Sequence, residues 1–204
     1  MSVSLKKGQK VSLTKKPTGQ DTGLSKVVVG LGWDEAPRKS GGLLSALFGG
    51  GGASIDCDAS AFVLKDGKLV GTNDIVYFGN KSHSSGTIQH MGDNLTGAGA
   101  GDDEQIVIDL SRVPAQYDRI VFVVNIYQAT QRKQSFGMIR NAFIRIVDGK
   151  TKEEFLKYNL TDDYAGMTAL IFGEVYRHNG EWKFNAVGQG TTDPDLRALA
   201  NRYI

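Results

Sequence analysis

Residues 119–127 read Arg119-Ile120-Val121-Phe122-Val123-Val124-Asn125-Ile126-Tyr127, an almost continuous apolar run rich in valine and isoleucine. β-Branched and aromatic residues favour extended backbone, and a run without polar alternation is typical of a strand covered on both faces. The run therefore predicts a strand at the centre of a β-sheet.

Outward from this run, apolar residues recur with a period of two over most of the chain, as expected for strands rather than helices. Asp66-Gly67 and Asn179-Gly180 are typical of tight hairpin turns. The pattern predicts an all-β fold, an antiparallel β-sandwich of about 10–11 strands. Besides the central run, the segments expected to be strands are 3–5, 10–13, 26–31, 54–64, 74–78, 104–110, 142–147, 153–158, 169–176 and 181–187.

Helix is expected only near the C-terminus, where Asp193-Pro194 supplies a capping aspartate followed by a first-turn proline. Residues 38–53 differ in composition from the rest of the chain and end in a run of glycines, which predicts a flexible Gly-rich loop. Its apolar residues, such as Leu47 and Phe48, could either dock on a partner or fold onto the sandwich. Residues 1–204 are expected to form a single domain.

The chain is 40% hydrophobic and 23% charged with a formal net charge of +2, so no nucleic-acid partner is expected. Cys57 is the single cysteine, which excludes an internal disulfide and a thiolate zinc cluster. No signal peptide and no apolar run of about 18 residues is found, so no transmembrane segment is expected. The predicted location is cytoplasmic, with a peripheral position at the inner membrane as the alternative.

The stretch from His90 to Glu104 contains four carboxylates and four glycines but no lysine or arginine. Carboxylates this close repel one another unless a cation lies between them, and glycines allow backbone carbonyls to turn toward the same point. Calcium prefers such an all-oxygen environment. The pattern favours a calcium site over a solvated acidic loop, while His90 is read as structural because calcium avoids imidazole.

A second acidic element is Asp56-Cys57-Asp58-Ala59-Ser60, in which strand alternation places Asp56, Asp58 and Ser60 on one face and Cys57, as a buried residue, on the other. Although Asp93 and Glu104 begin and end a twelve-residue span, that span lacks the ligands and the glycine of an EF-hand loop. The site is therefore expected between loops of a sheet protein.

Several motifs together resemble the TerD family, in the family's order and over nearly the whole chain. The acidic glycine motif is the most specific of them, whereas Cys57 stands where leucine is more usual and residues 38–53 fall where the family varies. The segments that carry the resemblance are Gly30-Leu31-Gly32-Trp33-Asp34, residues 55–61, Asp93 to Gly97, Gly101-Asp102-Asp103-Glu104, Ala169 to Arg177 and Trp182 to Gly190.

The resemblance implies a calcium-binding β-sandwich with two ions and a role in the bacterial stress response, including tellurite resistance, as a non-enzymatic scaffold or sensor. Implied partners are other Ter-type stress-response proteins, in a complex that could be membrane-associated. Six carboxylates near one centre leave about −4 after one calcium ion and about −2 after two, which favours two ions. The expected ligands are the side chains of Asp56, Asp58, Asp93, Asp102, Asp103 and Glu104, with Asn94 and the carbonyls near Leu95 and Gly99 as weaker candidates.

Asp34 either completes the shell of the second ion or caps a turn. Two other functions stay open: a calcium-dependent membrane-surface or ligand-binding module, and a metal-dependent hydrolase. The hydrolase is disfavoured because zinc and iron enzymes normally use histidine ligands among their carboxylates. His83 lies beside serines, but neighbours in sequence do not make a catalytic triad.

Overall fold

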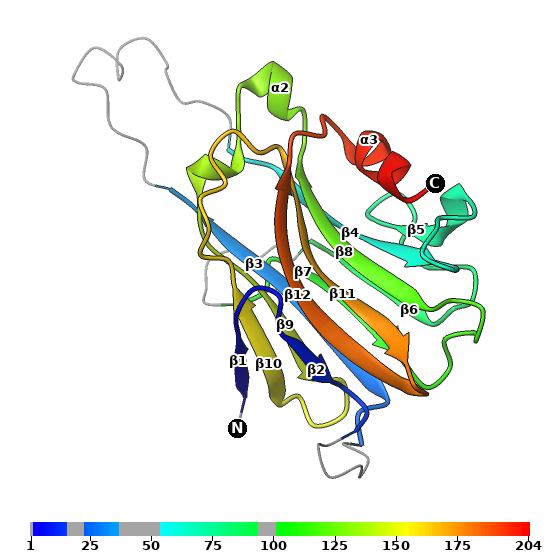
Figure 1. Cartoon of the computed structure of the whole chain (residues 1–204). Coiled ribbons are helices and arrows are strands. Elements are labelled where there is room, and N and C mark those ends of the chain that lie inside the picture. The colour runs from blue at the N-terminus through cyan, green and yellow to red at the C-terminus, as the bar shows by residue number, and fades with distance from the viewer. Residues whose placement is uncertain (1, 16–22, 37–53, 94–100) are drawn as a thin grey trace, which may run out of the picture.

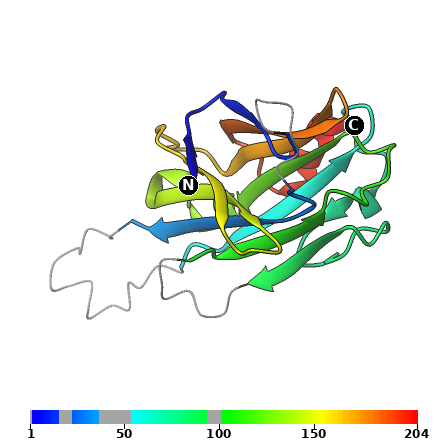
Figure 2. The same cartoon turned by 90° about the horizontal axis from the view of Figure 1, so that it is seen from below.

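The computed structural model describes residues 2–15, 23–36, 54–93 and 101–204, which form two six-stranded sheets packed face to face (Figure 1). The first sheet has the order β1 (Val3–Leu5), β10 (Glu154–Asn159), β9 (Ile139–Asp148), β3 (Lys26–Glu35), β7 (Glu104–Asp109) and β6 (Ile88–Asp93). The second has the order β2 (Lys10–Ser12), β12 (Glu181–Thr191), β11 (Ala169–His178), β8 (Arg119–Ile126), β4 (Cys57–Leu64) and β5 (Ile75–Val76). The predicted β-sandwich is confirmed, and Figure 2 shows its two layers edge-on.

The central strand is also confirmed, because β8 pairs antiparallel with β4 on one side and β11 on the other. Its inward residues, including Phe122 and Val124, belong to the main core between the sheets. Its outward residues Val121 and Val123 join a second apolar cluster with Leu199 of the helix α3 (Leu196–Ala200). The run is apolar on both faces because a sheet covers one face and a helix covers the other.

Three details differ from the expected strand pattern. Strand β6 was not expected, because Ile88–Asp93 begins the acidic stretch and its pairing with β7 shifts register between His90 and Asp93. Strand β1 runs parallel to β10, so the first sheet is mixed. Strand β5 keeps only Ile75–Val76, because Asp74 belongs to the 3₁₀ turn η1 (Thr72–Asp74) and Tyr77 forms an isolated bridge with Asn80 after the strand.

The turn and helix signals are mostly borne out. The residues of both predicted hairpin turns have positive φ, with 52° at Asp66 and 51° at Asn179. The C-terminal helix exists, but its cap is Asp195, whose carboxylate accepts the Ala198 N–H at 2.8 Å, rather than Asp193. The remaining helical segments are α2 (Ala129–Arg132), η2 (Phe136–Met138) and η3 (Asn201–Tyr203).

No helix in the part of the chain that the structure describes is long and apolar enough to cross a membrane. The predicted Gly-rich loop at residues 38–53 lies outside the described residues. Cys57 is buried, with 7% of its surface exposed, as its place on the inner face of β4 predicts.

Candidate metal centre

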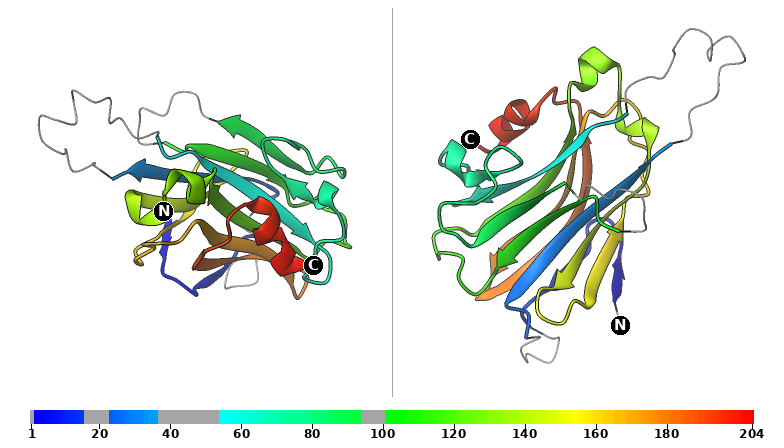
Figure 3. Two further views of the ribbon diagram at one scale, coloured as in Figure 1. Left: turned by 90° about the horizontal axis from the view of Figure 1, so that it is seen from above. Right: turned by 180° about the vertical axis from the view of Figure 1, so that it is seen from behind.

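The acidic segments meet at one end of the sandwich because four strands begin or end there (Figure 3). Strand β3 runs antiparallel to β7, with Leu31 opposite Glu104, and β6 brings Asp93 opposite Glu104 from the other side. Strand β4 begins at Cys57, directly after Asp56. The acidic residues therefore come from the ends of β3 and β6 and from the starts of β4 and β7.

The pKa of the Cys57 thiol is affected by several of these acidic groups. Burial raises the pKa of Cys57 well above its usual value, and the negative charges of Asp58, Asp56, Glu104 and Asp103 raise it further. Residues of both predicted acidic elements are therefore close enough to this buried thiol to raise its pKa.

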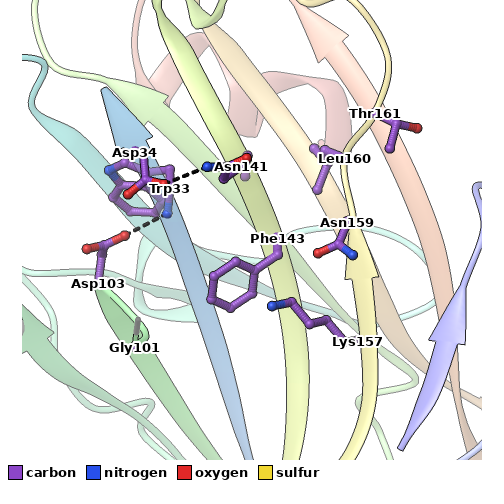
Figure 4. A pocket seen from close by; sticks show the side chains of 11 residues that line it. Trp33, Asp34, Gly101, Asp103, Asn141, Phe143, Lys157, Asn159, Leu160 and Thr161 are labelled. Carbon is purple, nitrogen blue, oxygen red and sulfur yellow. Dashed lines mark hydrogen bonds between the residues drawn. The ribbon is translucent and has the colours of Figure 1, made fainter. Parts of the chain in front are cut away.

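Asp103 and Asp34 share the mouth of a cavity of ≈ 780 Å³ on the outer side of the first sheet (Figure 4). The backbone N–H of Trp33 donates to Asp103 Oδ2 at 2.6 Å, and the side chain of Asn141 donates to Asp34 Oδ2 at 2.8 Å. The Asp103 N–H donates to the Leu31 carbonyl at 2.8 Å. Two carboxylates, one from β3 and one from the segment that leads into β7, are therefore held in fixed positions at one opening.

The surroundings of Asp103 disfavour its negative charge. Burial raises the pKa of Asp103, and the carboxylates of Asp34 and Asp102 raise it further against the opposing effect of the Trp33 N–H. Lys157 also lines the cavity, but its ammonium lies 3.9 Å from the centroid of the Phe143 ring. An added cation at this mouth would relieve the repulsion between the carboxylates.

Asp102 has a cationic partner within the chain. Both of its carboxylate oxygens accept from the Arg145 guanidinium, at 2.6 and 3.1 Å, and Gln105 donates to the same carboxylate at 2.9 Å. Asp102 lies over Gly30, where a Cβ atom would collide with its carboxyl group. Gly30, which belongs to the motif shared with the TerD family, thus makes room for the buried carboxylate of this ion pair.

Glu104 points in the opposite direction, into the sandwich. His90 Nδ1 accepts the Gly92 N–H at 3.0 Å, so Nε2 carries the ring proton and donates to Glu104 Oε2 at 2.8 Å. The same carboxylate oxygen accepts the Ala59 N–H at 3.2 Å. His90 and Glu104, both buried, therefore link the acidic end of β7 to β4 across the core.

Two other predicted ligands, Asp56 and Asp58, do not line the cavity of Asp34 and Asp103. Asp58 and Ser60 point to the outer side of the second sheet, as strand alternation predicts, and line a separate cavity. Asp56 is exposed and its carbonyl accepts the Tyr127 N–H at 2.7 Å. Within the described ranges, no three acidic, histidine or cysteine side chains lie close enough together to hold a metal ion. Asn94, Leu95 and Gly99 lie outside the described residues, and Asp93 is described only in its backbone.

A second polar cluster, at the opposite end, was not expected from the sequence. His83 lies between Asp74, at 3.1 Å from Nε2, and the Ser85 hydroxyl, at 2.7 Å from Nδ1. Tyr117 also donates to Asp74 at 3.2 Å, and Ser85 Oγ lies 2.7 Å from Thr87 Oγ1. The imidazole is wholly buried, so the network ties down the 82–87 turn. A sequence signal existed only for His83 and Ser85, because Asp74 and Tyr117 come from distant segments.

The fold and the acidic end define a class of protein: a two-sheet β-sandwich whose strand ends gather carboxylates at one edge. The TerD domain matches residues 1–203, and the chain belongs to this family. It is 56% identical to the stress response protein SCP2 of Bacillus subtilis over the full length of both chains. It is 47% identical to the tellurium resistance protein TerD of Serratia marcescens, over 93% of this chain and 91% of that protein.

A solved structure, that of a homologue of telluride resistance protein (TerD) from Streptomyces coelicolor, has the same fold. It matches with a TM-score of 0.59 at 26% sequence identity and covers 86% of this chain and 96% of that one. The family resemblance expected from the motifs is therefore confirmed.

Proposed function

We propose that this chain is a calcium-binding protein of a bacterial stress response, of the tellurium-resistance type, and that the bound ion orders its acidic end for partner proteins. Support for the stress-response role comes from the relatives, whose names are stress response protein and tellurium resistance protein. We propose a scaffold or sensor role without catalysis, in which Ter-type relatives are the expected partners.

The observation that carries the calcium proposal is the pair Asp34 and Asp103 at one cavity mouth. Both side chains are fixed by hydrogen bonds to Asn141 and Trp33, and the pKa of Asp103 is raised by burial and by its acidic neighbours. Among the described residues, neither carboxylate forms a salt bridge with a lysine or arginine. Carboxylates held together without a cation of the chain are suited to a hard divalent ion.

Asp34 and Asp103 would hold the ion, and its shell of six to eight oxygens would be completed by the predicted donors Asp93, Asn94, Leu95 and Gly99. Asp102 and Glu104, on either side of Asp103 in the chain, would act as positioning residues. Arg145 anchors Asp102 on the outer face of the first sheet, while His90 anchors Glu104 in the core. A second ion, as the resemblance implies, would draw on Asp56 and Asp58 at the start of β4.

Thermal unfolding with added calcium or chelator tests the proposal. Calcium that binds only the folded chain raises the free energy of unfolding by about 2.7 kcal/mol at ~100 times its dissociation constant. Asp103→Asn and Asp34→Asn should each abolish most of this gain. Metal counting on the same samples should give two ions per chain if Asp56 and Asp58 hold the second. A melting temperature that ignores both millimolar calcium and chelator would exclude the calcium site.

Asp66→Asn is the matched control, because it also removes one carboxylate but lies beyond the far end of β4, in a turn where asparagine suits the positive φ of 52°. It should leave the calcium response unchanged. Sedimentation with anionic vesicles separates the scaffold from the membrane-surface module: calcium-dependent pelleting would favour the module, and its absence the scaffold.

A further inference from the structure

The outer face of the second sheet carries a cavity of ≈ 330 Å³ that is lined by Asp58 but by none of the other carboxylates proposed to bind calcium. It lies over the start of β4 and the end of β8 and is bordered by the segment that leads into α3. Its volume is near the lower end of the range of roughly 300–1,000 Å³ typical of small-ligand sites. The size suits a small ligand or a single side chain.

Two polar groups that line this cavity are buried and lack a partner. Ser60 is 0% exposed and Asn125 is 7% exposed. Within the described part of the chain, neither Ser60 Oγ nor Asn125 Oδ1 has a hydrogen-bond partner. Buried polar atoms are nearly always hydrogen-bonded, because an unmet group loses its hydration without compensation. These two atoms therefore indicate a ligand with hydrogen-bond donors.

The sheet register places Asp58, Asn125 and Thr191 in one row across the sheet, with the apolar Ala169 between the last two. Asp58 lies opposite Asn125, Asn125 lies opposite Ala169, and Ala169 lies opposite Thr191, so the row crosses four strands. Thr191 Oγ1 is a third buried atom without a partner among the described residues. Directly opposed residues have Cβ atoms roughly 4.5–5.5 Å apart, so Asp58 and Asn125 can contact one small group together.

The charge and the walls of the cavity favour a cation. Asp58 and Asp195 are both part of its lining, and no lysine or arginine is found among the described residues that line it. At its rim lie two exposed rings, Phe78 at 54% and Tyr127 at 43%. Aromatic faces attract cations, and the Tyr127 ring already has the Arg132 guanidinium 5.0 Å from its centroid.

We propose that this cavity binds a primary ammonium group on a short alkyl chain, supplied by a free amine or by a lysine side chain of a partner peptide. The ammonium has three N–H donors and no acceptor, which matches Asn125 Oδ1, Ser60 Oγ and the Asp58 carboxylate. The alkyl chain passes between the exposed rings of Phe78 and Tyr127. The proposed site is separate from the Asp34 and Asp103 mouth, which lies on the first sheet, but it shares Asp58 with the proposed second calcium ion.

NMR titration of the ¹⁵N-labelled full chain tests the proposal with n-butylamine as probe and 1-butanol as its neutral match. Butylamine should shift the side-chain amide of Asn125 and the signals of Ser60 and Tyr127, whereas butanol at equal concentration should not. Equal shifts with butanol would overturn the cation, because the cavity would then bind the alkyl chain or a hydroxyl group.

Substitutions then test the named atoms. Ser60→Ala removes only an atom without a partner among the described residues, so it should not lower the melting temperature, and Asn125→Leu removes Asn125 Oδ1. Each should weaken butylamine binding by about tenfold, the usual effect of a hydrogen bond to a charged group. Asn125→Asp should strengthen it, and Asp103→Asn should leave it unchanged. Unaltered affinity in both Asn125 variants would overturn the site, as would displacement of butylamine by calcium, which would assign the cavity to the second ion.

The two sources of the ammonium are separated by a capped tripeptide Gly-Lys-Gly. Binding at least tenfold tighter than butylamine would assign the site to a partner lysine, while equal or weaker binding would assign it to a free amine. Both results support the ammonium. Failure of both probes would overturn the proposal.

Discussion

Two carboxylates at opposite ends of the sandwich, Asp74 and Asp103, are stabilised in different ways. Asp74 is 7% exposed and receives hydrogen bonds from His83 and Tyr117, so its partners all belong to the chain. Asp103 receives one backbone N–H from Trp33 and has other carboxylates as neighbours. Two side chains of the fold therefore stabilise the first carboxylate, whereas the second has acidic neighbours, which is the setting on which the calcium proposal rests.

The largest effect on this difference between Asp74 and Asp103 is expected when His83, the partner of Asp74, is removed. His83→Leu leaves a buried carboxylate without its imidazole, so the free energy of unfolding should fall by about 3–5 kcal/mol. The loss should be the same in calcium and in chelator, as measured by urea denaturation. His178→Leu, at an exposed hairpin position, should change stability by less than about 0.5 kcal/mol.

Arg145→Met should have a smaller effect on the acidic end. The arginine is 28% exposed, so water can partly replace it beside Asp102, and we expect a loss of about 2–3 kcal/mol. Adding Asp102→Leu to the same chain should recover part of that loss, because the uncompensated charge is gone. A double variant less stable than Arg145→Met alone would show that Asp102 has a further essential partner.

The smallest change in the free energy of unfolding is expected for Asp103→Asn in chelator, and this substitution should stabilise the protein. Since the folded pKa of Asp103 is raised, the wild-type carboxyl contributes stability at low pH that is lost as pH rises from the unfolded toward the folded pKa. Asparagine avoids that loss, so the variant should be more stable than wild type above this window, by less than about 1 kcal/mol because the site is partly solvated. Unfolding curves across pH 3–7 measure the difference, and a variant less stable than wild type at pH 7 would contradict it.

The strand pattern could be predicted because alternation and turn residues are local signals. Asp-Gly and Asn-Gly predicted the hairpin turns at Asp66 and Asn179. The apolar run predicted that β8 is covered on both faces. Strand β6 was missed because its pairing with β7 is irregular between His90 and Asp93 and because its sequence, Ile-Gln-His-Met-Gly-Asp, has no regular alternation of apolar and polar residues. The parallel pairing of β1 with β10 joins segments too distant for a local pattern to connect.

For the candidate site, the sequence identified the acidic groups but not their partners. Arg145 is 43 residues from Asp102, and His90 is 14 residues from Glu104, so only the fold brings each pair together. The sequence also did not show which face of the sheet each carboxylate points to. Asp102 points to the outer face and Glu104 points into the core. Calcium binding itself stays a prediction.

The single sulfhydryl of the chain has a practical consequence. Alkylating agents react with the thiolate, and at Cys57 that form is disfavoured by burial and by the negative charges of nearby carboxylates. Labelling can therefore proceed only while the start of β4 is open to solvent. The labelling rate of Cys57 therefore measures how often the acidic end of the native protein opens locally.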